Sequence, residues 1–259
     1  MFELFIYLLA GLGAGLVTGF AGLSAAIVVT PLLVSLCGWG SYDAVTMALA
    51  ADVLASFLSA STYRKNGNIA LKKGALIALA AFLGTVAGSL CGYWFSRAQP
   101  DGLGYLSMLS TIIMGARFIF WPITGGAPAE NAQAGAQRKR LLRAAALGLP
   151  IGWICGFTGS GGGILMLAVL TMVLGCDLKT AVGTSTLIMT LVALVGAGSH
   201  LALGAHMSWQ PAVLVMAACA VGAVGAAKFA NHCEEKKLNR IIGALLALLG
   251  AFTLAIKLW

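Results

Sequence analysis

Long, uninterrupted apolar stretches restrict the fold of this sequence more than any other feature. There are ten, at roughly 2–19, 23–37, 44–63, 73–95, 103–121, 141–157, 161–175, 180–200, 210–230 and 238–258. Six of them approach the roughly 20 residues that a helix needs to cross a bilayer core. Only 9% of the residues are charged, against about 25% in soluble domains. We therefore expect an all-α polytopic membrane protein, and the composition excludes a soluble enzyme. The apolar stretches do not alternate with polar residues, which argues against a membrane β-barrel.

An internal repeat divides the chain into two halves. A shift of 137 positions superimposes Gly15, Gly19, Phe20, Gly22 and Ile27 on Gly152, Gly156, Phe157, Gly159 and Ile164, and the register continues without a gap to Gly67 and Gly204. Such self-similarity indicates two homologous units. We predict a first repeat over 1–121, a cytoplasmic linker over 122–140 and a second repeat over 141–259. Each repeat begins with two short apolar segments, read as a helical hairpin, and continues with three transmembrane helices.

The basic residues favour opposite orientations for the two repeats. If each short pair forms a hairpin whose ends emerge on one side, 14 of the 16 lysines and arginines lie on one side of the membrane. If each pair instead makes a single crossing, the division is 10 to 6. Because basic residues concentrate in cytoplasmic loops, the first arrangement is preferred. It predicts inverted-topology repeats with both termini outside the cytoplasm.

Glycine-rich breaks inside the two hairpins are the strongest candidates for a binding site. The first contains Gly22, Leu23 and Ser24; the second contains Thr158, Gly159, Ser160, Gly161, Gly162 and Gly163. Interrupted helices in inverted repeats frequently hold the substrate of a transporter. The second helix of each hairpin begins at such a break, where free backbone N–H groups favour an anion. The alternative is that these glycines serve only close helix packing.

Two further polar groups lie within apolar segments. Thr184 and Ser185 follow Gly183 near the start of the stretch 180–200. Their hydroxyls either line the same site or bond carbonyl groups of their own helix. Asp52 lies in the middle of the stretch 44–63, with Ser56 one turn later. A carboxyl group at bilayer depth is costly and suggests function, so we expect Asp52 and Ser56 to couple transport to protons or to gate it. The alternative is a structural hydrogen bond.

These motifs resemble those of the TauE/SafE sulfite exporter family. The resemblance rests on the sequence Gly-Phe-x-Gly-x-Gly-Gly-Gly at 156–163, on Ala-Val-Gly-Thr-Ser at 181–185, and on Gly-Phe-Ala-Gly-Leu-Ser at 19–24 followed by Pro31. It covers nearly the whole chain and implies a transporter of sulfur-containing anions such as sulfite, thiosulfate or organosulfonates. The first repeat departs from the pattern, because Ser24-Ala25-Ala26 replaces the glycine triplet and Thr46-Met47-Ala48 replaces Gly-Thr-Ser.

The sequence thus favours a secondary transporter of a small, sulfur-containing anion in the cell (inner) membrane. We expect no cofactor, metal or nucleic acid, since the six cysteines lack metal-binding spacing and the basic residues border apolar segments. Its partners would be the anion and the lipid bilayer; the anion, the direction of transport, the coupling ion and the oligomeric state stay open. Two alternatives are an intramembrane serine hydrolase, with Ser160 as nucleophile and His200 as base, and a non-transporting membrane scaffold.

Overall fold

A computed structural model provides the structure of the chain. It describes residues 2–107, 109–110, 113, 134–160, 162–234, 237, 240–241, 244 and 248. The predicted linker 122–140 therefore lies mostly outside the described residues, as do much of the predicted segment 103–121 and most of 238–258. Within the described residues the regular structure is entirely helical, which confirms the predicted all-α class.

The described helices of the first half are α1 (Phe2–Ala21), α2 (Ala26–Cys37), α3 (Ser41–Lys65) and α4 (Leu71–Ala98). Those of the second half are α6 (Ala134–Thr158), α7 (Gly162–Ala168), the π-helical turn η1 (Val169–Val173), α8 (Leu178–Ala202) and α9 (Trp209–His232). Six of them, namely α1, α3, α4, α6, α8 and α9, are long and apolar enough to cross a membrane. The chain is a multi-pass membrane protein.

The first member of each predicted hairpin is longer than expected. The sequence predicts short helices at 2–19 and 141–157, but α1 has 20 residues and α6 has 25. Helix α6 begins at Ala134 and carries the basic residues that we had assigned to the linker up to 140. Lysine and arginine are good helix formers, so their charge ends the apolar run without ending the helix. Among the helices that the structure bounds, the returning segments, α2 and α7 with η1, are too short to span.

Among the described residues, six glycines adopt left-handed backbone conformations, and their positions follow the predicted repeat. Gly22 and Gly159 have φ angles of 64° and 69°, and each ends the first helix of a hairpin. Gly38 and Gly175 follow the returning segment at 66° and 65°. The remaining two, Gly67 and Gly204, lie in the loops after α3 and α8. Each of the three pairs is separated by 137 residues, and positive φ favours glycine at each position.

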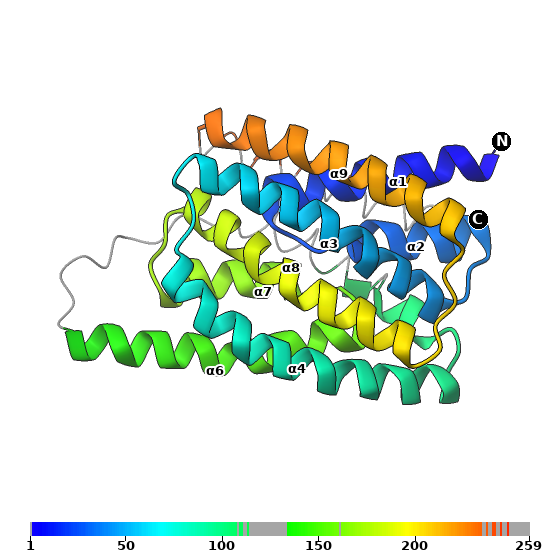
Figure 1. Cartoon of the computed structure of the whole chain (residues 1–259), viewed down its shortest axis with the longest axis horizontal. Helices are drawn as coiled ribbons and strands as arrows, with labels where there is room; N and C mark the ends of the chain where they lie inside the picture. Colours follow the sequence, from blue (N-terminus) through cyan, green and yellow to red (C-terminus); the bar gives the residue numbers. More distant parts are fainter. Residues whose placement is uncertain are drawn as a thin grey trace.

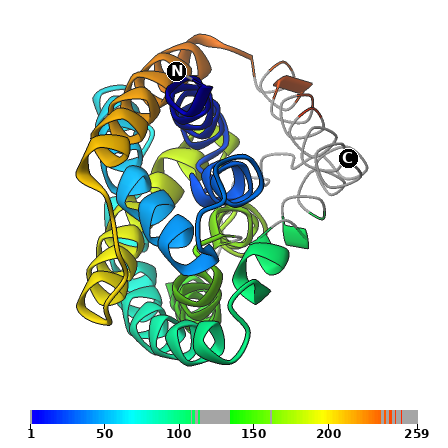
Figure 2. The same ribbon diagram turned by 90° about the vertical axis from the view of Figure 1, so that its right-hand side faces the viewer.

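The two halves exchange helices. Helix α1 packs along α9, and α6 packs along α4, so the first helix of each half lies against the last described spanning helix of the other. Figure 1 places these two helix pairs at opposite edges of the molecule, with α3 and α8 between them. Figure 2 looks along the bundle, so that several helices are seen nearly end-on.

Glycines allow the helices to approach closely in both pairs, α1 with α9 and α6 with α4. A Cβ atom at Gly15 of α1 would meet the backbone of Cys219 and Ala223 in α9. A Cβ atom at Gly152 of α6 would likewise meet the backbone of Ala81 in α4. Small residues let membrane helices approach to backbone contact. Close helix packing is therefore the role of the spaced glycines on the two helices. They are Gly11, Gly15 and Gly19 on α1, and Gly148, Gly152 and Gly156 on α6.

Candidate functional site

The tips of the two hairpins meet in the interior of the protein. Gly163, at the start of α7, lies so close to the first tip that a Cβ atom there would be 2.6 Å from the carbonyl oxygen of Gly22 and from Cα of Leu23. The Ser24 hydroxyl donates a 2.8 Å hydrogen bond to the carbonyl of Gly159. The glycines therefore allow backbone-to-backbone contact between segments 137 residues apart in sequence.

Helix α8 brings one more hydroxyl to this junction. Ser185 Oγ lies 3.1 Å from the carbonyl oxygen of Gly22 and 3.4 Å from that of Gly163, one carbonyl from each tip. Its single proton can be donated to only one of them at a time. Ser185 thus belongs to the junction that the sequence predicted around the two glycine-rich breaks.

The second tip has its own hydrogen-bond network. Thr158 Oγ1 accepts from the backbone N–H of Ser160 at 3.2 Å and lies 2.8 Å from the Ser160 carbonyl oxygen. The Ser160 hydroxyl lies 2.9 Å from that of Ser110. Sequence reasoning missed Ser110, because no pattern shows which residue of the segment after 101 faces the tip. Gly161 lies outside the described residues.

Thr184 does not reach the junction. Its hydroxyl donates to the Thr180 carbonyl at 2.6 Å and accepts the backbone N–H of Ala70 at 3.0 Å. Of the two roles predicted for these hydroxyls, bonding to a carbonyl group of the same helix applies to Thr184. Ser185 instead contacts the junction. The threonine joins α8 to the start of α4.

Asp52 is fully buried beside the first tip. Oδ1 accepts a 2.8 Å hydrogen bond from Ser56 Oγ, and Ser56 is also fully buried. The other oxygen, Oδ2, has no hydrogen-bond partner within the described residues. The polar neighbours of the carboxyl group include Thr18, Ser24 and the backbone N–H of Ala25 at the start of α2. The carboxyl group of Asp52 thus has one oxygen without a hydrogen-bond partner beside the start of α2.

The starts of α2 and α7 differ in what faces them. At α2 the N–H of Ala25 neighbours the carboxyl group of Asp52. At α7 the equivalent N–H, that of Gly162, neighbours the sulfur of Cys155. Met189 occupies the repeat position of Asp52. The first tip therefore contains an acidic group of the protein itself, whereas the start of α7 faces an uncharged thiol.

Two buried side chains at equivalent positions hold the ends of α3 and α8 to the hairpins. Tyr63 Oη donates to the carbonyl of Gly19 at 2.9 Å, and Nε2 of His200 lies 3.0 Å from the carbonyl oxygen of Gly156. Nδ1 of His200 lies 3.2 Å from Thr46 Oγ1. We call the Tyr63–Gly19 and His200–Gly156 contacts the two latches. Tyr63 and His200 occupy equivalent positions of the repeat, and this equivalence is the sequence signal for the pair.

The described junction is closed to solvent. Leu23, Ser24, Asp52, Ser160 and Ser185 each have no exposed surface. Gly22, Gly159, Gly162 and Gly163 are buried as well, and Thr158 is partly buried. A ligand that binds at this junction needs the surrounding helices to move apart first.

Comparisons with known proteins agree with this architecture. The sequence matches the family described as "Sulfite exporter TauE/SafE" over residues 7–253. It is 26% identical over 271 residues to the "Probable membrane transporter protein YunE" of Bacillus subtilis (strain 168), with 95% of each chain covered. It is also 26% identical over 245 residues to the "Probable membrane transporter protein YdhB" of the same organism, with 93% of this chain and 96% of the relative covered. No solved structure gives a significant match.

Proposed function

Since this chain belongs to the TauE/SafE sulfite exporter family and is a membrane transporter, we propose that it carries a small sulfur-containing anion across the cell (inner) membrane. Sulfite, thiosulfate and organosulfonates are the substrate class. The observation that carries this proposal is the meeting of the two hairpin tips, with the Ser24, Ser160 and Ser185 hydroxyls buried around them. Buried donors and helix starts suit an oxyanion.

The start of α7 is the part of the junction best suited to the anion. The carboxyl group of Asp52 neighbours the start of α2 directly, whereas the start of α7 neighbours the sulfur of Cys155, on which Asp52 acts electrostatically without a hydrogen bond. In this proposal the backbone from Gly159 to Gly163 forms the cradle, and Ser160 and Ser185 add hydroxyl donors. Gly22, Leu23 and Ser24 cover the cradle from the opposite tip.

The transport cycle would open the junction to one side at a time. Helix pairs α1–α9 and α4–α6 flank the central helices α3 and α8, so movement of the outer pairs could separate the tips. Each latch lies at the C-terminal end of its central helix, Tyr63 on α3 and His200 on α8. These two helices run in opposite directions (Figure 1), so the latches lie toward opposite ends of the bundle. In inverted repeats these ends face opposite sides of the membrane, so each latch would hold one side closed.

Asp52 would couple the anion to a proton. Its free Oδ2 and its place next to the first tip support this role, with Ser56 holding Oδ1 in position. A hydrolase finds no support in the hydrogen bonds. His200 contacts Gly156 and Thr46, while the Ser160 hydroxyl contacts Ser110 and Thr158.

Uptake into proteoliposomes tests the proposed function. Purified full-length protein should take up labelled sulfite, thiosulfate or a small sulfonate, and an excess of unlabelled substrate should compete. Chloride and an uncharged sulfone should not compete, because neither presents several charged oxygens to backbone donors. Empty liposomes are the control. If none of the sulfur anions enters faster than it enters empty liposomes, the substrate class is wrong; hydrolysis of an ester without flux would favour the enzyme.

The inverted arrangement predicts that equivalent loops lie on opposite sides of the membrane. Asn66, after α3, and Ser208, before α9, are both exposed and flank the glycine-containing loops of the two repeats. In a background in which the exposed Cys91 is replaced by serine, Asn66→Cys should react with an impermeant maleimide only after the cells are opened. Ser208→Cys should react in intact spheroplasts. Labelling of both from the same side would contradict inverted repeats.

A further inference from the structure

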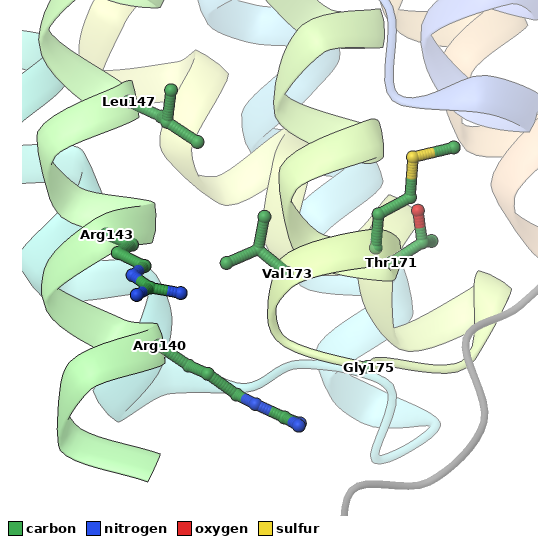
Figure 3. Close-up of a pocket in the computed structure, with 7 residues that line it drawn as sticks. Arg140, Arg143, Leu147, Thr171, Val173 and Gly175 are labelled. Carbon is green, nitrogen blue, oxygen red and sulfur yellow. The ribbon is translucent and has the colours of Figure 1, made fainter. Parts of the chain in front are cut away.

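A basic cavity away from the hairpin junction has no role in the transport cycle described above. It has a volume of about 550 Å³ and lies between the first part of α6 and the end of η1. Arg140 and Arg143 come from α6; Thr171, Met172, Val173 and Gly175 come from η1 and the turn after it, and Leu147 completes the lining. Figure 3 shows both arginine side chains directed from α6 toward the segment that carries Val173 and Gly175.

The charge of this cavity is uncompensated by its own lining. Neither lining element contributes a carboxylate, and within the described residues neither arginine makes an ion pair. Asp177 is the acidic residue nearest in sequence, but its carboxylate caps α8 by accepting the backbone N–H of Thr180 at 3.0 Å. Two guanidinium groups three residues apart on a helix lie on one face. They offer several N–H donors to one group with charged oxygens, as phosphate recognition by arginine requires.

Leu147 and Met172 form an apolar, outward-facing part of the lining, whereas Thr171 is buried. Met172 is 68% exposed and Leu147 is 43% exposed, so the cavity has an open apolar side next to its basic side. Gly175 lies in the short turn before α8, one of the six spanning helices. The cavity therefore lies at the end of the bundle, where the spanning helices leave the apolar region. A ligand that matches both sides has a charged phosphate group and a hydrocarbon portion.

We propose that this cavity binds the headgroup of an anionic phospholipid, with its phosphate on Arg140 and Arg143 and its acyl chains along Leu147 and Met172. Basic cavities between membrane helices bind lipid headgroups in this way. The site is separate from the junction that we propose for the transported anion, so either proposal can fail while the other stands. A free oxyanion could bind the two arginines in the same way as a lipid phosphate, but it has no hydrocarbon portion to contact Leu147 and Met172.

Lipid binding to the purified full-length protein tests the proposal. Delipidated protein in a neutral detergent is titrated with phosphatidylglycerol, phosphatidylcholine or inorganic phosphate, and bound lipid is counted by native mass spectrometry. Phosphatidylglycerol should bind at least about tenfold more tightly than phosphatidylcholine. The double variant Arg140→Gln/Arg143→Gln should lose that preference. Its matched control, Arg138→Gln/Lys139→Gln, removes the same charge from the adjacent exposed positions of α6 and should keep it.

A second variant covers the case in which the double substitution disturbs folding. Met172→Glu adds a carboxylate to an exposed lining position and leaves both arginines in place, and it should weaken phosphatidylglycerol binding in the same way. Equal binding by the double variant and the unmodified protein would overturn the proposal. So would an equal loss in the control, which would indicate unspecific attraction. Saturable binding of inorganic phosphate that depends on Arg140 and Arg143, without a preference for the lipid, would instead assign the cavity to a soluble anion.

Discussion

Replacing Asp52 with asparagine is expected to preserve anion binding and to abolish the dependence of transport on pH. Asparagine keeps the size of the side chain and can still accept the hydrogen bond from Ser56, but it cannot carry a proton. A pH gradient across proteoliposomes should drive the unmodified protein several-fold faster than no gradient. The variant should show the same flux in both conditions, while its anion affinity, measured by the protection that the anion gives against thermal unfolding, stays unchanged.

The matched control for this experiment is Asp101→Asn, which neutralises an exposed carboxylate in the turn after α4. It should retain the response to the gradient. Ser56→Ala should retain a response too, shifted along the pH axis, since it removes the hydrogen bond to Oδ1 and leaves the carboxyl group. A wild-type pH profile in Asp52→Asn would make this residue a structural hydrogen-bonding group.

Replacing Gly163 with alanine should reduce transport by about tenfold to a hundredfold. The added methyl group would lie 2.6 Å from the Gly22 carbonyl oxygen and from Leu23 Cα, both backbone atoms of the other tip. Relieving such an overlap typically costs about 1–3 kcal/mol. Alanine is otherwise favoured over glycine within a helix by about 1 kcal/mol, so a loss of activity cannot come from helix propensity. Flux in proteoliposomes at matched protein content is the measurement.

Gly198→Ala is the appropriate control, because this glycine is within α8 and no atom of another segment lies within 4 Å of the added carbon. It should transport at the normal rate and unfold at the same or a slightly higher temperature. If Gly163→Ala also transports normally, close contact of the two tips is not required during the cycle, and the cradle has to be sought elsewhere.

The sequence predicted the breaks and the residues at them because both depend on local chemistry. A left-handed turn favours glycine, and the shift of 137 residues marks Gly22 and Gly159 as the same turn in two copies. The buried Asp52 could be recognised from its position within an apolar stretch. The role of Ser185 was only half predicted, because spacing cannot distinguish a hydroxyl that faces its own helix from one that faces a neighbour.

What the sequence could not provide is which helices touch. An apolar helix in a bilayer has little need for an amphipathic pattern, since lipid and protein neighbours are both apolar. The packing of α1 on α9 therefore left no signal except its spaced glycines. For the same reason Ser110 and Cys155 could not be assigned to the second tip, and the full burial of His200 could not be foreseen.

The exchange of helices between the halves has a consequence for how the protein is made. Ribosomes deliver α1 first, yet its packing partner α9 ends at His232, almost at the other end of the chain. Until α9 is inserted, the glycine-lined face of α1 has only lipid, an insertion factor or a wrong helix to contact. Helix α4 likewise lacks its packing partner until α6 has been synthesised and inserted. The first half cannot complete its packing until the second half has been made, so a chain truncated after the first repeat should be cleared by membrane proteases instead of accumulating as a stable half.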